Sequence, residues 1–194
     1  MIIEQSGISK KQKQSKLFGF LIGLGVFLIA IAIMSVIRVT PYSVYKDPAT
    51  GVQVKYPSYW EMLNRPDGGA VVAFRSPPQT ALDTYAENVN IVFQDLSAKP
   101  MALPQYSQLA IRQFTGTFKT GTEIVESAPT RLANRPAYRF TYIVDIPEAS
   151  AIKLTHVWVV DGVRAYIFTY SATEADYDAY LGEVNTMLKS FTIL

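Results

Sequence analysis

The arrangement of hydrophobic positions divides the chain into two parts. Residues 17–37 form an apolar run of 21 residues without a charge. After it, apolar and polar residues alternate in the segments 52–57, 70–76 and 88–96, and this period-two alternation is typical of β-strands. The pattern therefore predicts one apolar helix followed by a domain rich in strands.

The apolar run is long enough to cross a membrane as a helix. At about 1.5 Å per residue it spans roughly 31 Å, close to the hydrocarbon thickness of a bilayer. Four lysines lie between residues 10 and 16, whereas Arg38 is the only basic residue directly after the run. The positive-inside rule then predicts a cytoplasmic basic tail (1–16), a single transmembrane helix (17–37) and a C-terminal domain on the extracytoplasmic side.

A cleaved signal peptide is the alternative interpretation of the same segment. The sequence Ala30-Ile31-Ala32 resembles a small-x-small cleavage site. Cleavage there would leave a mature chain that begins with Ile33-Met34, an apolar end with no obvious place to pack. We therefore favour an uncleaved anchor, with residues 38–50 as a tether to a domain that comprises residues 51–194.

The C-terminal half of this domain is predicted to be a meander of strands. Asn134-Arg135-Pro136 reads as a turn between two of them, and Asp161-Gly162 is a strong signal for a two-residue hairpin. Consecutive strands joined by short turns pair antiparallel. The predicted strands of the meander cover residues 122–133, 137–146, 151–160 and 163–171.

Two segments follow a helical period instead. Within residues 104–119, one side of the predicted helix is formed by Tyr106, Leu109, Ala110 and Phe114. Near the C-terminus, Thr173 and Asp176 have the spacing of a capping box, and they predict the start of an amphipathic helix. Its apolar stripe consists of Tyr177, Tyr180, Leu181, Val184, Met187, Leu188 and Phe191.

Several predicted strands carry apolar residues on both faces. Tyr166, Phe168 and Tyr170 alternate with Ala165 and Ile167, and a sheet that is covered on both sides explains this better than a sheet with one wet face. The prediction is therefore an α+β domain, an antiparallel sheet with helices packed on it, preceded by one transmembrane helix.

The composition excludes several classes of function. The chain has no cysteine and one histidine, so it has no disulfide, no cysteine-based metal site, no thiol nucleophile and no lipid-modified N-terminal cysteine. Its net charge of +2 comes from the N-terminal tail, because residues 38–194 hold 14 basic and 15 acidic residues. A near-neutral domain gives no support for a nucleic-acid partner.

Candidate catalytic chemistry depends on His156. It shares a strand face with Leu154 and Trp158, which is typical of a hydrogen-bonded core histidine. The chain has no G-x-S-x-G elbow, no Walker A loop and no D-x-D-x-D-G calcium loop. We therefore predict a protein without catalytic residues or cofactor. An envelope hydrolase and a calcium site stay open as alternatives, the latter from aspartates near strand ends: Asp95, Asp145 and Asp161.

Polar amides and aromatic residues are the candidate binding residues. Asn88, Asn90 and Gln94 lie on one face of a predicted strand, and buried amides need hydrogen-bond partners, although a water-facing edge of the sheet would also explain them. Tyr59 and Trp60 are candidates for an aromatic patch, whereas the alternative places Trp60 in the core where the strand ends at Pro57.

One run of residues resembles a known family. Gly51-Val52-Gln53-Val54-Lys55-Tyr56-Pro57-Ser58-Tyr59-Trp60 is similar to the "G-hydrophobic-x-hydrophobic-x-Y-P-x-x-W" opening of the PsbP superfamily. Phe74 and the strand Glu87-Asn88-Val89-Asn90-Ile91 continue the resemblance, which covers roughly residues 42–194. It implies an α/β/α sandwich around a central antiparallel sheet.

The resemblance also implies a function without catalysis. Family members include the extrinsic lumenal PsbP protein of the photosynthetic oxygen-evolving complex and related proteins of bacteria and archaea without a photosynthetic role. This chain departs from cyanobacterial relatives that are lipoproteins, since it has no cysteine, and only His156 is present as an imidazole ligand for a metal.

We therefore expect a membrane-anchored, extracytoplasmic binding or accessory module. Its expected partners are the bilayer and a membrane protein complex. Two alternatives stay open: a photosystem II-associated extrinsic or assembly protein of the oxygen-evolving complex, and the envelope hydrolase.

Overall fold

The computed structural model describes residues 41–194 except 67, 81–82, 84, 118–121 and 147–148. Pro41–Leu194 form one compact unit. The predicted basic tail (1–16) and transmembrane helix (17–37) lie outside the described residues. Within the described part of the chain, no helix is both long enough and apolar enough to cross a membrane.

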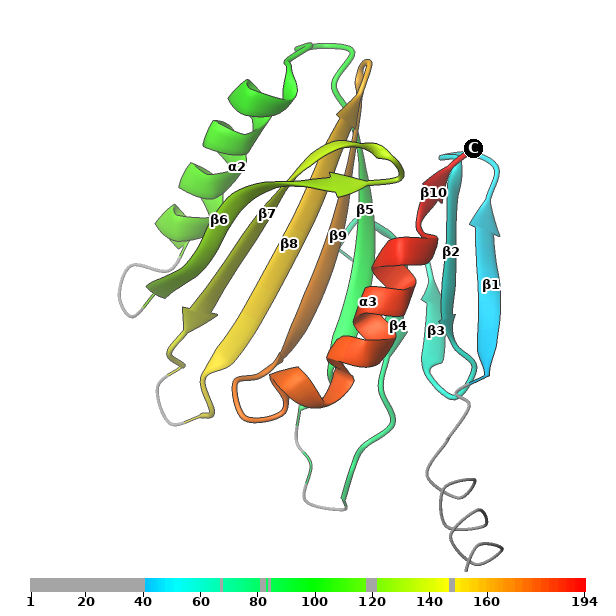
Figure 1. The fold of residues 1–194 in the computed structure, drawn as a ribbon, viewed down its shortest axis with the longest axis vertical. Coiled ribbons are helices and arrows are strands. Elements are labelled where there is room, and N and C mark those ends of the chain that lie inside the picture. The colour runs from blue at the N-terminus through cyan, green and yellow to red at the C-terminus, as the bar shows by residue number, and fades with distance from the viewer. Residues whose placement is uncertain (1–40, 67, 81–82, 84, 118–121, 147–148) are drawn as a thin grey trace, which may run out of the picture. The chain divides into compact units, whose positions relative to one another are not determined.

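A seven-stranded sheet forms the centre of the domain (Figure 1). All of its neighbouring strands pair antiparallel, and those of the C-terminal meander do so as its short turns predicted. In spatial order the strands are β3 (Glu61–Asn64), β4 (Ala70–Arg75), β5 (Asn88–Asp95), β9 (Arg164–Thr173), β8 (Ile152–Asp161), β7 (Arg135–Val144) and β6 (Thr122–Leu132).

A second, three-stranded sheet contains β1 (Tyr42–Asp47), β2 (Val52–Pro57) and β10 (Thr192–Ile193), in the order β1-β2-β10. β1 lies within the segment that the sequence predicted to be a tether, so residues 42–47 belong to the folded domain. Tyr45 and Asp47 are the only buried residues of β1, and its alternation is therefore too weak to predict a strand.

Helices cover both faces of the seven-stranded sheet (Figure 1). α2 (Leu103–Thr117) closes one hydrophobic cluster with β7, β8 and β9. α3 (Leu181–Ser190) and the three-stranded sheet close the cluster on the opposite face. The predicted α+β fold with a covered antiparallel sheet is confirmed. In α2 the prediction for Leu109 is wrong, because its side chain is 43% exposed while Tyr106 and Ala110 are buried.

The last helix begins later than the sequence predicted. Thr173 and Asp176 do form the predicted contact, with the Asp176 N–H donating to Thr173 Oγ1 over 3.1 Å. A turn and a short 3-10 helix, η1 (Tyr177–Tyr180), follow before α3 starts. The Tyr177 carbonyl accepts the hydroxyl of Tyr170, and the Leu181 N–H donates to Asp178 instead. A tertiary hydrogen bond thus occupies a carbonyl that an α-helix would need.

The predicted apolar stripe of this segment is nevertheless buried. Tyr177, Val184, Met187 and Phe191 are core residues, and the other members of the stripe pack against them. The spacing of apolar residues therefore predicted the buried face correctly, although the backbone around Tyr177 is not α-helical.

The hairpin of β6 and β7 changes direction along its length. Its register shifts between Ile124 and Glu126, and such a bulge bends a strand pair. The far end of the hairpin crosses the face of the sheet that carries α3 (Figure 1). There Leu132 is buried in the same core cluster as α3, and this contact fixes the end of the hairpin beside the helix.

Candidate functional site

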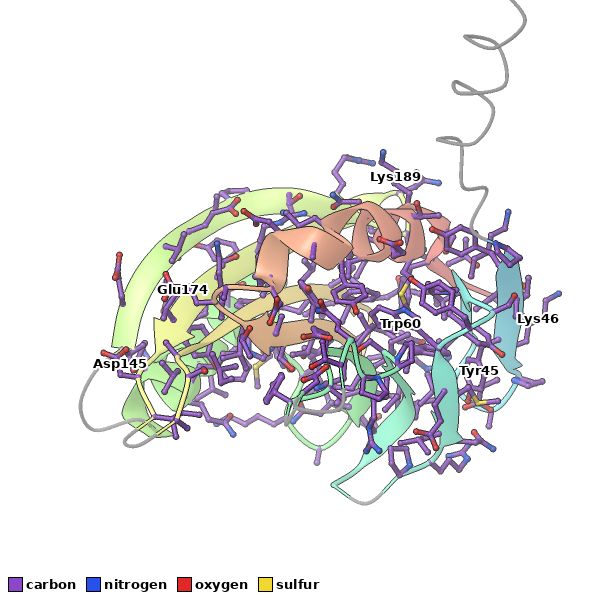
Figure 2. All side chains as sticks on the ribbon, turned by 90° about the horizontal axis from the view of Figure 1, so that it is seen from below. Tyr45, Lys46, Trp60, Asp145, Glu174 and Lys189 are labelled. Carbon is purple, nitrogen blue, oxygen red and sulfur yellow. The ribbon has the colours of Figure 1, made fainter. Side chains whose placement is uncertain are left out.

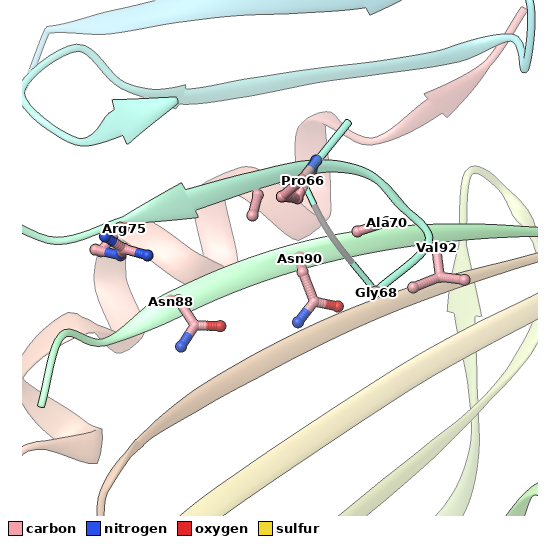
Figure 3. Close-up of a pocket in the computed structure, with 8 residues that line it drawn as sticks. Pro66, Gly68, Ala70, Arg75, Asn88, Asn90 and Val92 are labelled. Carbon is pink, nitrogen blue, oxygen red and sulfur yellow. The ribbon is translucent and has the colours of Figure 1, made fainter. Parts of the chain in front are cut away.

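One part of the α2 face of the sheet has no helix over it. β4 and β5 pair so that Arg75 lies opposite Asn88 and Ala73 opposite Asn90. Figure 3 shows Asn88 and Asn90 projecting from the same side of β5. They border a hollow of about 310 Å³, here named the amide groove, which is lined by Pro66, Gly68, Ala70, Ala73, Arg75, Asn88, Asn90 and Val92.

The two asparagine amides of the amide groove are largely unused by the protein. Among the described residues, the half-buried Asn90 side chain makes no hydrogen bond. Asn88 donates from Nδ2 to the Ala86 carbonyl over a long 3.4 Å. Each amide has two donor hydrogens and an acceptor oxygen. The groove therefore presents both donors and acceptors to a ligand.

Two polar residues of the neighbouring strand β9 are paired with the asparagines of β5. Ser171 lies opposite Asn88, and Thr169 lies opposite Asn90. The Tyr85 hydroxyl donates to Ser171 Oγ over 3.0 Å, so these residues are already hydrogen-bonded within the protein. Thr169 Oγ1 in turn lies 2.9 Å from His156 Nδ1, so the asparagines of β5 have fewer hydrogen bonds within the described residues than their neighbours on β9.

A second hollow of about 390 Å³ adjoins the amide groove, and Arg75 lines both. Tyr59 lies in this second hollow, is 46% exposed, and donates its hydroxyl to Glu183 Oε1 over 3.4 Å. Partial burial raises the pKa of the Tyr59 hydroxyl, so it stays protonated and able to donate. Arg75 pairs with Glu61 over 3.6 Å at the exposed surface.

The segment that precedes Asn88 is held by hydrogen bonds within the protein. Ser76 Oγ donates to Glu87 Oε2 over 2.6 Å, and the Ser76 N–H donates to the Glu87 carbonyl over 2.8 Å. Glu87 is only 1% exposed. Asp83 accepts the backbone N–H groups of Gln79 and Tyr85. These bonds fix both ends of the connection between β4 and β5, and hence the position of Asn88.

The structure separates the five residues predicted as a binding surface. Asn88 and Asn90 line the amide groove, and Tyr59 lies in the adjoining hollow. Gln94 is on the same face, but its Oε1 accepts the hydroxyl of Tyr106 in α2 over 2.8 Å.

Trp60 does not belong to any exposed patch. It is 3% exposed and packs edge-on against Tyr180, and Figure 2 shows it among the packed side chains inside the domain. The core alternative of the sequence analysis is therefore correct for Trp60. Arg75, by contrast, was not predicted, because its place beside Asn88 depends on the register of β4 against β5.

His156 is a buried core residue, as the sequence predicted. Its Nδ1 lies 2.9 Å from Thr169 Oγ1, its Nε2 lies 3.2 Å from Tyr142 Oη, and Phe114 stacks on the ring. Burial lowers the pKa of His156 to about 4. The imidazole is therefore neutral near pH 7, and it is shielded from any substrate in solution.

The aspartates considered for calcium do not converge. Asp95 and Asp161 lie opposite Arg164 at one end of the sheet, while Asp145 follows β7 at the other end. Asp161 pairs with Arg135 over 3.2 Å. The described residues contain no group of three or more histidine, aspartate or glutamate side chains that could hold a metal ion.

Solved structures of three proteins have a similar fold. Cyanobacterial PsbP (CyanoP) from Synechocystis sp. PCC 6803 has 16% identity and a TM-score of 0.57, covering 82% of this chain and 96% of its own. LpqN of Mycobacterium tuberculosis, involved in cell envelope biogenesis, has 11% identity and a TM-score of 0.57, with coverages of 78% and 90%. The Ran-binding protein Mog1p of Saccharomyces cerevisiae has 7% identity and a TM-score of 0.55, with coverages of 79% and 96%.

At such low identities, the structural likeness shows a shared fold alone. No curated protein matches the chain in sequence. The sequence profile of the PsbP family, however, matches residues 40–193, which include both sheets, both helices and the amide groove. The chain therefore belongs to the PsbP family.

Proposed function

We propose that this chain is a membrane-anchored accessory protein whose extracytoplasmic PsbP domain binds a membrane protein complex through the amide groove. The observation that carries the proposal is the pair of half-buried asparagines, Asn88 and Asn90, which face an open hollow and make one long hydrogen bond between them to the described part of the chain. In an open hollow these amides are paired with water, and a ligand with matching donors and acceptors can replace that water without breaking a hydrogen bond of the protein.

The spacing of the asparagines favours a protein partner. Asn88 and Asn90 are two residues apart on β5, so their amides follow the strand at the repeat of an extended chain. Each amide can donate to a carbonyl and accept from an N–H of a peptide bond. An extended segment of the partner, laid along the groove, would satisfy both side chains.

The environment of His156 on the α2 face of the sheet favours binding over hydrolysis. The only histidine is neutral, stacked under Phe114 and hydrogen-bonded at both ring nitrogens. A general base must reach the proton that it abstracts, and His156 is 6% exposed. Mog1p, which has a similar fold, is a Ran-binding protein. Both points favour an accessory role.

A membrane anchor at residues 17–37 would strengthen such binding. Tethering confines the domain to a thin layer at the bilayer, and this raises its effective concentration toward membrane partners. Photosystem II is one such complex, and co-purification with photosystem cores would identify it as the partner.

The test is in-membrane crosslinking followed by pull-down. The full-length protein is compared with Asn88→Ala/Asn90→Ala and with Gln94→Ala, a control on the same strand face whose amide is held by Tyr106. We expect the double variant to lose most of the captured partner and the control to retain it. Equal capture by both variants would exclude the amide groove as the binding site.

Two further measurements separate the parts of the proposal. A version without residues 1–37 should capture less partner, and equal capture would show that tethering contributes nothing. Turnover of an envelope substrate that is lost in His156→Ala would overturn the accessory function in favour of the hydrolase.

A further inference from the structure

A small groove lined by basic residues lies between α3 and the end of the β6–β7 hairpin. It has a volume of about 160 Å³, and Arg131, Arg139, Asn185 and Lys189 supply its polar lining. We name it the basic groove. Arg139 shares its side of the sheet with Val157 of the α3-side cluster, so the basic groove and the amide groove lie on opposite faces.

Within the described residues, no ion pair balances the positive charge of the basic groove. Among the described residues the ion pairs are Arg65–Asp47, Arg75–Glu61 and Arg135–Asp161, and none of them includes a residue of this groove. No aspartate or glutamate that the structure describes lines the groove. Three cations that converge without a counter-charge repel one another, and a bound anion would relieve that repulsion.

Arg139 is the least exposed of the three basic residues that line the groove. It is half-buried on the sheet, between Ala128 of β6 and Val157 of β8. Burial raises the pKa of the Tyr177 hydroxyl, and among its charged neighbours Arg139 lowers this pKa while Glu126 raises it. Glu126 nevertheless forms no ion pair with Arg139, so the guanidinium stays available.

The basic groove is a product of tertiary structure. The bulge in β6 bends the hairpin, and the buried Leu132 holds its end against the α3 side of the core. Arg131 donates to the Asn134 carbonyl within the hairpin turn, which orients its guanidinium. Arg131 is therefore held in place before any ligand arrives, and this preorganisation favours binding.

We propose that the basic groove binds a phosphate group. Guanidinium groups donate paired hydrogen bonds that match phosphate oxygens, and an ammonium group adds a third positive charge. The groove volume of about 160 Å³ suits a single tetrahedral anion with part of its substituent. The phosphate belongs either to a soluble molecule or to a phospholipid headgroup, and the same contacts serve both.

Chemical modification of Lys189 tests the proposal on the full-length protein in neutral detergent. Acetylation of each lysine is followed by mass spectrometry in inorganic phosphate and in chloride of equal ionic strength. Phosphate at about ten times its Kd should slow acetylation of Lys189 roughly tenfold. Lys46, which is exposed on β1, is the internal control and should not change.

Paired arginine variants show whether the effect belongs to this groove. Arg139→Ala removes one charged donor and should weaken phosphate binding about tenfold. Arg131→Gln should also weaken phosphate binding. Because Arg131 is exposed, this variant should fold normally and so controls for a folding defect in Arg139→Ala. Arg112→Ala, on the exposed side of α2, is the matched control and should bind phosphate like the parent protein.

Lipid nanodiscs distinguish the two sources of phosphate. Stronger protection of Lys189 by phosphatidic acid in the disc than by inorganic phosphate assigns the groove to a lipid headgroup. Equal or stronger protection by inorganic phosphate in neutral discs assigns it to a soluble ligand. Protection by neither, or an equal loss of binding in Arg112→Ala, would overturn the proposal. Because the two grooves lie on opposite faces, that outcome would leave the amide groove proposal intact.

Discussion

The ring of Phe114 lies flat on the imidazole of His156, with ring centroids 4.0 Å apart and ring planes 8° apart. Phe114 belongs to α2 and His156 to β8, so this contact joins the helix to the sheet. Together with Thr169 and Tyr142, which contact the two ring nitrogens, Phe114 keeps water away from the histidine. This enclosure is the cause of the lowered pKa.

The enclosure of His156 predicts a specific dependence of stability on pH. The pKa of the imidazole falls from 6.5 to about 4 in the folded protein. Between these values the unfolded chain binds a proton that the folded chain excludes, so the free energy of unfolding decreases as the pH falls. The full loss is about 3 kcal/mol, reached near pH 4.

Urea denaturation across this pH range measures the effect. His156→Gln lacks the titrating group, so the difference between its profile and that of the parent isolates the histidine from the carboxylates. Parallel profiles between pH 6.5 and 4 would show that the imidazole is not held neutral.

Removal of the Phe114 ring should expose the histidine. Phe114→Ala is expected to raise the pKa of His156 toward 6.5 and to lower the free energy of unfolding by about 3 kcal/mol. Leu109→Ala, in the same helix but with a 43% exposed side chain, should change stability by at most about 0.5 kcal/mol. Histidine NMR titration reports the pKa without ambiguity, because the chain has one histidine. An unchanged pKa in Phe114→Ala would assign the desolvation to other neighbours.

Gly51 is required where the first hairpin meets the C-terminus. Its φ is +78°, and an added Cβ would lie 3.0 Å from the Leu194 carbonyl oxygen. The Leu194 N–H also donates to the Gly51 carbonyl over 2.8 Å. Gly51→Ala is therefore expected to cost about 2 kcal/mol, through backbone strain and displacement of the last strand.

Gly182 provides the matched control for Gly51. It lies in α3 without a positive φ, and nothing is within 4 Å of an added Cβ. Gly182→Ala should raise the free energy of unfolding by up to about 1 kcal/mol, because alanine favours helix. Thermal unfolding of the two variants gives the comparison, and equal shifts would contradict the role assigned to Gly51.

The alternation of apolar residues predicted the strands that carry core side chains, but it missed β1, β3 and β10. β10 consists of two residues, Thr192 and Ile193, which are paired with β2. β3 has three exposed positions out of four. Such strands exist because a neighbouring strand offers hydrogen bonds, and backbone pairing of this kind leaves little trace in the sequence pattern.

The candidate site was predictable only in part, for a related reason. Asn88 and Asn90 were identifiable because polar amides occupy one face of a strand whose other face is apolar. Their neighbour Arg75 is set by strand register. The basic groove brings together Arg131, Arg139 and Lys189 from three separate elements through a bend in one hairpin. The spacing of these residues along the chain carries no such information.

The contact between Thr173 and Asp176 has a different role from the helix cap that its spacing predicted. Thr173 Oγ1 donates to Asp176 Oδ2 over 2.7 Å and accepts the Asp176 N–H over 3.1 Å. The pair closes the turn between β9 and η1, and so it sets where Tyr177 enters the core. Thr173→Val keeps the shape but removes both hydrogen bonds, and we expect a loss of about 1 kcal/mol.

Thr186→Val is the control for this substitution, because the Thr186 hydroxyl only donates to the Gly182 carbonyl within α3. Its effect should stay within about 0.5 kcal/mol. Asp176→Ala alone should have a smaller effect than Thr173→Val, because the Asp176 N–H can still donate to Thr173. Urea denaturation of the three variants orders these contributions. An equal loss in Thr173→Val and Thr186→Val would show that the turn does not depend on the pair.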